Sequence, residues 1–238
     1  MTTLIRPFSH GNNVAVIYVS NGNFFRKVSY KSSGRKYIDN EYSGLAWYSE
    51  IVSRKTLIKK YTHNENYSCI DIQKVEGGRA DYRAGLTKNQ DYIDLCIDHY
   101  LDVFPREKVV PCHGDLTLDN VIFSKNGAIF FDWEHFSLSG EAWGFDIAYL
   151  LMSSAFFPYY KQGSLPSKHI AIFRRLWGRL KENGLRGDIA TQPMTYFKQV
   201  FRSKNHWKKI ISNSPNKLFP MWSEDDFTAY LHNILKDC

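Results

Sequence analysis

The chain has 238 residues, of which 43% are hydrophobic and 23% are charged, and its net charge is +7. This composition excludes a disordered or fibrous chain, and the length permits either one large domain or two small lobes. The positive charge is local: residues 161–217 hold 13 Lys and Arg against two acids, a net of +11, and the rest of the chain sums to −4. Because net charge bears on binding partners rather than on fold, this basic segment is a candidate surface for an anionic partner.

The cysteines and the apolar stretches indicate the compartment. Four cysteines are scattered along the chain without a C-x-x-C pair, unlike a small disulfide-rich secreted domain. The first ten residues contain no apolar core of signal-peptide length. The longest nearly apolar stretch, residues 144–152, includes Asp146 and is too short to span a bilayer. We therefore expect a reduced, soluble protein of the cytoplasm without a transmembrane segment.

The first part of the chain has the pattern of a small antiparallel sheet with one helix. Five strands are expected, over residues 2–8, 14–19, 23–30 and twice within 56–76. The Asn21-Gly22 pair between the second and third strands is typical of a hairpin turn. From Ile38 the apolar period becomes helical, with one face formed by Glu41, Leu45, Tyr48 and Val52. The order β-β-β-α-β-β follows, and Glu76-Gly77-Gly78 ends it like a hinge.

After this hinge the pattern is mainly helical. Apolar residues recur at helical spacing from residue 88 to residue 104. A polar loop over 112–120 is followed by a second hairpin over 121–131, which turns at Asn126-Gly127. The remainder of the chain has the periodicity of helices, without an internal repeat or a low-complexity tract.

The segment with chemical interest runs from His113 to Asp132 and has the form H-x-D-x-x-x-x-N, then a strand, a turn, a strand and an Asp. Asn120 precedes the first strand of the hairpin and Asp132 follows the second, so the tight turn is expected to bring these two residues together. An amide oxygen and a carboxylate suit Mg²⁺, which prefers oxygen ligands and nucleotide phosphates. Asp115 lies on the same loop, placed to accept a proton from an attacking hydroxyl.

The spacing alone is weak evidence, since H-x-D-x-x-x-x-N arises by chance in roughly a few per cent of chains of this length. A polar loop with Asp and Asn is also ordinary turn chemistry. The hairpin and the Asp at its end supply the structural context that such a motif requires. We therefore interpret the segment as a catalytic loop.

The chain resembles the aminoglycoside phosphotransferase and choline kinase family, which is related to the protein kinases, in three stretches: HGDLTLDN at 113–120, FFDWE at 130–134 and GFDIA at 144–148. The resemblance implies an α+β, protein-kinase-like bilobal fold. It implies a nucleotide-binding lobe at residues 1–78, with a small antiparallel sheet and one helix. A mainly helical lobe at 79–238 would carry the catalytic loop and the acceptor site.

The same resemblance implies a role for each polar residue of the loop. Asp115 is the catalytic base, and His113 orients the loop. Asn120 and Asp132 bind Mg²⁺. The cofactors are therefore expected to be ATP and Mg²⁺, and the protein is expected to be a kinase with an alcohol group as acceptor.

Such kinases also need a strand lysine for the α- and β-phosphates and a helix glutamate that holds it. Lys27 alternates with Arg26 on the expected third strand, so only one of them faces the cleft, and the family position favours Lys27. The helix offers Glu41 on its apolar face, with Glu50 as the competitor. The plain alternative for Lys27 is a solvated lysine on a strand. For Glu41 it is a surface carboxylate near the start of a helix, where acids are favoured in any case.

The expected phosphate loop, residues 9–13, has one glycine where G-x-G-x-x-G has three. This departure favours the small-molecule branch of the family over the protein kinases. Its backbone N–H groups or the Ser9 hydroxyl are the expected contacts to phosphate.

The acceptor is predicted from composition, because the C-terminal helices contain no recognised motif. Aromatic residues after residue 133 suit a cation–π box for a choline-like amine, although at helical spacing they more often form a core. The basic excess at 161–217 favours a neutral or anionic acceptor, or contact with an anionic surface, over a polycationic aminoglycoside. Solvated helix faces are the plain alternative. A sugar, sugar phosphate or surface-glycan precursor is therefore expected ahead of choline or ethanolamine.

The sequence leaves two other classes of protein as alternatives. A pseudokinase module that binds nucleotide without turnover is disfavoured, because every catalytic position is filled. Nucleic-acid binding through 161–217 is disfavoured, because no reader motif accompanies the charge.

Overall fold

The structure is a computed structural model that describes residues 2–6, 14–19, 22–52, 56–203 and 225–236. The chain divides into two compact units. The first unit comprises Met1–Gly77, Pro111–Asp115 and Phe131–Gly140, and the second comprises Gly78–Val110, Leu116–Phe130 and Glu141–Cys238. Two short pieces from the middle of the sequence, which contain His113 and Asp132, therefore fold with the N-terminal sheet.

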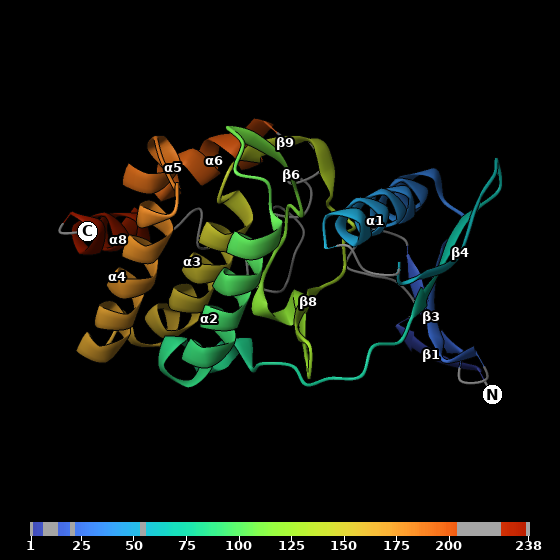
Figure 1. Ribbon diagram of the computed structural model, residues 1–238, viewed down its shortest axis with the longest axis horizontal. Coiled ribbons are helices and arrows are strands. Elements are labelled where there is room, and N and C mark those ends of the chain that lie inside the picture. The colour runs from blue at the N-terminus through green and yellow to red at the C-terminus, as the bar shows by residue number, and fades with distance from the viewer. Residues whose placement is uncertain (1, 7–13, 20–21, 53–55, 204–224, 237–238) are drawn as a thin grey trace. The chain divides into compact units, whose positions relative to one another are not determined.

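The first unit is built on a five-stranded antiparallel sheet with the strand order β1-β2-β3-β5-β4. Its strands, some of which are labelled in Figure 1, are β1 (Thr2–Arg6), β2 (Ala15–Val19), β3 (Phe24–Ser29), β4 (Ile58–His63) and β5 (Ser68–Gln73). In the central pair β3 and β5, Lys27 lies opposite Ile70 and Arg26 opposite Asp71. The expected order β-β-β-α-β-β is confirmed.

Helix α1 (Ser32–Ile51) packs against strands β3, β4 and β5 of this sheet. Its buried face includes Ile38, Glu41, Leu45 and Tyr48, as the helical period predicts. The helix begins at Ser32, six residues before the expected start at Ile38. The residues in between are mostly polar or small, so they carry no apolar period from which a helix could be predicted.

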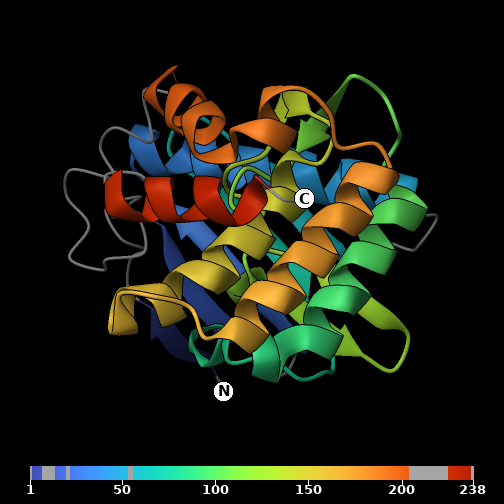
Figure 2. The ribbon, with the colours of Figure 1, turned by 90° about the vertical axis from the view of Figure 1, so that its left-hand side faces the viewer.

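The second unit is mainly helical. Its longer helices are α2 (Leu86–Val103), α3 (Phe145–Gln162), α4 (Ser167–Glu182), α6 (Pro193–Ser203) and α8 (Asp225–Leu235), and α5 (Asp188–Thr191) is a single turn. Figure 2 shows α2, α3 and α4 side by side, in agreement with their contacts. The core of the unit is aromatic, since Trp177, Phe173 and Phe197 are fully buried.

Short strands and turns complete the chain. The expected hairpin over 121–131 is present as β7 (Val121–Ser124) and β8 (Gly127–Phe130), which pair from Val121↔Phe130 to Ser124↔Gly127. A second two-stranded sheet joins β6 (Val109–Cys112) and β9 (Ser137–Ala142). The 3-10 turns η2 (Tyr82–Ala84) and η3 (Leu118–Asn120) precede α2 and β7.

These elements confirm the α+β class. Across the ranges that the structure describes, none of the helices has both the length and the apolar character needed to cross a membrane.

Candidate active site

Lys27 lies on β3, the central strand that bears the alternating pair Arg26 and Lys27. Successive side chains of a strand point to opposite faces of the sheet. The Arg26 guanidinium forms a two-point contact with Asp71 of β5, at 2.6 and 2.7 Å. The Lys27 side chain points to the other face, where it is only 9% exposed.

Three carboxylates surround the Lys27 ammonium. Its Nζ donates to Asp132 Oδ1 at 2.5 Å, to Glu41 Oε2 at 2.7 Å and to Glu134 Oε1 at 3.2 Å. Glu41 comes from α1, and Asp132 and Glu134 come from the segment after β8. All four residues belong to the first unit. One cation facing three carboxylates leaves an excess of negative charge at this cluster.

This excess affects the protonation of the cluster. Burial raises the pKa of Glu41 to about 7, and the neighbouring Asp132 and Glu134 add to this rise, while Lys27 opposes it. Burial by itself lowers the pKa of Lys27, but the three carboxylates outweigh burial and raise that pKa well above its ordinary value. Lys27 therefore stays charged, and the carboxylates carry more negative charge than Lys27 alone can balance.

The donor set of the cluster fits a divalent cation. Glu41, Asp132 and Glu134 each offer a carboxylate oxygen, and these oxygens all lie within 4.8 Å of one another. Hard oxygen ligands of this kind are those that Mg²⁺ prefers. Asp132 also has a backbone φ of +66°, in the left-handed region that few residues other than glycine adopt. Such strain is often found at functional sites.

His113 is completely buried and joins two parts of the loop. Its Nε2–H donates to the Phe131 carbonyl at 2.9 Å, and its Nδ1 accepts the Asp115 backbone N–H at 3.3 Å. Burial lowers the pKa of His113 to about 4, so the ring is neutral at pH 7. A neutral ring with this tautomer ties the residue before Asp132 to the backbone of Asp115.

The other predicted site residues lie as follows. Asp115 is half-buried and follows Gly114, whose φ of +84° places the backbone in the left-handed region. Asn120 is half-buried at the end of η3, where its backbone N–H donates to the Thr117 carbonyl at 2.9 Å. Asn120 belongs to the second unit and Asp132 to the first. Ser9 lies outside the described residues.

Two details of the cluster go beyond the sequence prediction. Of the two glutamates considered on α1, Glu41 contacts Lys27, whereas Glu50 is exposed. Glu134 was not predicted at all, although it stands two positions after Asp132. Residues 132–134 lie between β8 and β9 and Asp132 has a left-handed φ, so the alternation of side chains along a strand does not place Glu134 next to Lys27.

Part of the basic excess of 161–217 is paired within the second unit. Arg175 Nη2 contacts Asp94 Oδ2 at 2.7 Å, and Arg179 contacts both Asp94 and Asp98. The Arg174 Nε donates to the Ile234 carbonyl at 3.0 Å. The charge of this segment is therefore partly balanced by acids of α2, which a count along the sequence does not reveal.

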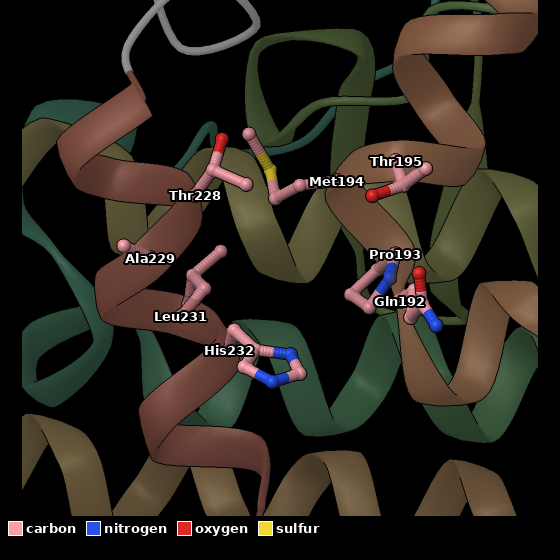
Figure 3. A pocket seen from close by; sticks show the side chains of 8 residues that line it. All are labelled: Gln192, Pro193, Met194, Thr195, Thr228, Ala229, Leu231 and His232. Carbon is pink, nitrogen blue, oxygen red and sulfur yellow. The ribbon is translucent and has the colours of Figure 1, made fainter.

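The second unit also contains a pocket of about 260 Å³ between the start of α6 and α8. Figure 3 shows Gln192, Pro193 and Thr195 on one side and Thr228, Leu231 and His232 on the other. None of the described residues that line it is a lysine or an arginine. The described lining of the pocket therefore contributes none of the basic charge of 161–217.

Residues 71–180 match the sequence model of the phosphotransferase enzyme family (APH). The match begins on β5 and includes His113, Asp115, Asn120 and Asp132, and it leaves out Lys27 and Glu41. No curated protein matches the chain. The resemblance expected from the sequence is thus confirmed over residues 71–180. This family implies a protein-kinase-like fold and phosphotransferase activity.

Proposed function

We propose that the protein is an ATP- and Mg²⁺-dependent phosphotransferase that moves the γ-phosphate of ATP to a hydroxyl group of a small molecule. The observation that best supports this proposal is the buried Lys27 ammonium among Glu41, Asp132 and Glu134. A lysine held by a helix glutamate, next to acidic ligands for a divalent cation, is the arrangement that kinases of this type require. The match over residues 71–180 supports the same reaction class.

Each residue is proposed to have one role. Lys27 binds the α- and β-phosphates of the nucleotide, and Glu41 holds it in place. Asp132 and Asn120 are the proposed ligands of Mg²⁺, which when bound neutralises negative charge on the phosphates. Ser9 is a proposed phosphate contact. We propose that residues 1–78 form the lobe that binds the nucleotide and that residues 79–238 form the lobe that binds the acceptor.

Asp115 is the proposed base. Its carboxylate takes the proton of the acceptor hydroxyl as the acceptor oxygen attacks the γ-phosphorus. One P–O bond forms to the acceptor, and the bond to the bridging oxygen of ADP breaks. His113 acts as a positioning residue, since its neutral ring holds the Asp115 backbone. Positioning and electrostatics are expected to supply most of the rate enhancement.

The proposed acceptor is a neutral or anionic small molecule, such as a sugar, a sugar phosphate or a surface-glycan precursor. Choline or ethanolamine is the alternative. The support comes from the basic excess of 161–217, and the pairing of Arg175 and Arg179 with aspartates reduces the charge available for an acceptor. The three described cysteines are free thiols, which favours the reducing cytoplasm as the proposed location.

The test is release of ADP from ATP in the presence of a panel of acceptors: sugars, sugar phosphates, choline, ethanolamine and aminoglycosides. We expect acceptor-dependent release by the natural protein and its loss in Asp115→Asn and Asp132→Ala. Asp102→Ala, which removes an exposed acid of α2, is the matched control and should retain full activity. Unchanged activity of Asp132→Ala would contradict the assignment.

A second outcome distinguishes the alternative class. Tight binding of ATP without release of ADP for any acceptor would support the non-catalytic nucleotide-binding module instead. A steeply salt-dependent affinity for DNA or RNA that does not change in Asp115→Asn would support the nucleic-acid hypothesis.

A further inference from the structure

Helix α1 bears Glu41, whose carboxylate contacts Lys27. One face of this helix also packs against the segment that follows Asp132. Along α1 the residues of this face recur at helical spacing, and they are Tyr37, Asn40, Glu41, Gly44, Trp47 and Tyr48. All of these residues and the segment 131–140 belong to the first unit. The depth at which α1 lies against this segment therefore determines where the Glu41 carboxylate stands.

Gly44 is the point of closest approach on this face. A Cβ at Gly44 would lie 2.6 Å from the Cβ of Trp133 and 3.0 Å from the Cβ of Phe136. Real Cβ atoms do not approach each other at the first of these distances, so a larger residue requires α1 and the segment that bears Trp133 to move apart. Gly44 is in the middle of α1, where glycine costs about 1 kcal/mol of helix stability relative to alanine. Close packing accounts for a glycine at this place.

Trp133, the residue closest to Gly44, packs among several aromatic rings. Trp133 is fully buried, and its ring lies 5.0 Å from that of Tyr48, 6.0 Å from that of Trp47 and 4.5 Å from that of His113. Trp133 thus contacts both the helix that bears Glu41 and the histidine that holds Asp115.

One helical turn before Gly44, a hydrogen bond adds to the contact between α1 and the segment that follows Asp132. The Asn40 side-chain amide donates to the backbone carbonyl of Glu134 at 3.0 Å. Asn40 and Gly44 lie one turn apart on α1, and they hold the two residues that follow Asp132. Glu41 lies between them in sequence, with its carboxylate 2.7 Å from Lys27.

We propose that Gly44 is a positioning residue: its lack of a side chain lets α1 pack against Trp133 at the depth that places Glu41 on Lys27. The inference rests on the proposed function, because the consequence for turnover assumes that Lys27 acts on the phosphates. A methyl group at residue 44 displaces α1 from Trp133 and separates Glu41 from Lys27. Small misplacements of this kind strongly lower the rate of transfer.

The test compares Gly44→Ala with Gly178→Ala. Gly178 is also inside a helix, α4, and a Cβ at Gly178 would meet no atom of the described residues within 4 Å beyond its own stretch of helix. Both changes raise intrinsic helix propensity equally, so they differ in the contact with Trp133. We expect kcat to fall on the order of 10- to 100-fold in Gly44→Ala, with a smaller change in the KM for ATP. Gly178→Ala should keep the natural kcat, and equal kcat values for the two variants would overturn the proposal.

A double-mutant cycle with Glu41→Gln separates positioning from a general loss of stability. If Gly44 acts through Glu41, then Gly44→Ala should have little further effect on kcat in the Glu41→Gln background. Fully additive losses would contradict the proposal. Should Gly44→Ala not fold, Asn40→Ala tests the same contact, with a kcat lower by about fivefold and the same dependence on Glu41.

A measurement without substrate keeps the inference distinct from the proposed function. The ¹⁵N-labelled ammonium of a buried, paired lysine gives an NMR signal that exchange with water removes when the lysine is released. We expect the same Lys27 signal in the natural protein and in Gly178→Ala, and a shifted signal with faster exchange in Gly44→Ala, because the ammonium loses Glu41 and keeps only Asp132 and Glu134. If the natural protein transfers no phosphate, the proposed function fails while this comparison still tests Gly44. An unchanged Lys27 signal in Gly44→Ala would overturn the positioning role.

Discussion

The two units of the chain place their charged side chains differently. In the first unit the side chains of Lys27 and Glu41 are 9% and 1% exposed, whereas in the second unit those of Arg175 and Asp98 are 48% and 52% exposed. Buried charges interact in a medium that screens them poorly, and exposed charges are screened by water and salt. The same residue types therefore have chemical consequences in the Lys27 cluster of the first unit and form mainly a solvated, paired surface between α4 and α2 of the second.

The largest effect is expected for Lys27→Met in the first unit, compared with the same exchange at an exposed lysine of the second unit. Lys27→Met removes the cation that balances Glu41, Asp132 and Glu134, and we expect turnover to fall on the order of 100-fold or more. Loss of one partner of a buried ion pair also destabilises a protein by about 3–5 kcal/mol. Lys88→Met, at an exposed position of α2, should change neither quantity appreciably. ADP release and urea unfolding of both variants measure the contrast, and equal effects would remove the distinction between the units.

A smaller effect is expected on the free energy of unfolding, to which His113 makes a contribution that depends on pH. Its pKa of about 4 in the folded protein lies below its ordinary value of 6.5. Between these values the unfolded chain binds a proton that the folded chain does not, so stability falls as the pH falls from 6.5 to 4. The size of this contribution is on the order of 3 kcal/mol. It should be present in full above pH 6.5 and lost below pH 4.

Comparison with His113→Gln isolates this contribution. Glu41 has the opposite effect, because its pKa of about 7 lies above its ordinary value of 4.5 and its contribution to stability falls as the pH rises between them. Glu41 is present in both proteins, so its effect cancels in the difference. Urea unfolding at several pH values should show the advantage of the natural protein over His113→Gln shrinking towards pH 4. An advantage that stays constant with pH would mean that His113 is not held neutral.

The smallest effect is expected at the exposed pairs between α4 and α2. A double-mutant cycle of Arg175→Ala and Asp94→Ala should give a coupling energy below about 1 kcal/mol, because both side chains are in contact with solvent. This coupling should shrink further at about 1 M salt, where the screening length is about 3 Å. A coupling that is large and independent of salt would show that the second unit also protects its charges.

Most of the first unit could be predicted from the sequence because its signals are local. Alternating strands, the helical face with Glu41 and the pair Arg26 and Lys27 are all visible within short windows. The cluster around Lys27 could be predicted in part, because the family resemblance pairs Lys27 with Glu41, although the two residues meet only in the tertiary fold. Glu134 was missed, since nothing in the hairpin pattern itself assigns a role to the residue after Trp133.

Features that depend on distant neighbours could not be predicted. The strand β9 was missed because Ser137–Ala142 has little apolar character and pairs with β6, far away in the sequence. The pairing of Arg175 and Arg179 with α2 was missed because charge was counted along the chain, while the balancing acids lie about 80 residues earlier, on a neighbouring helix. The roles of the site residues themselves remain predictions.

The left-handed backbone of Asp132 limits which residues can replace it during evolution. Glycine, asparagine and aspartate are the residues that tolerate a φ near +66° best, and only aspartate among them brings a full negative charge. Glutamate carries the same charge but fits this backbone poorly. The backbone conformation and the required negative charge thus restrict residue 132 independently of each other. Drift at this position would be narrow even if the chemistry of the site changed, and a glycine or asparagine found there in a relative would indicate a site that has kept its backbone and lost a carboxylate.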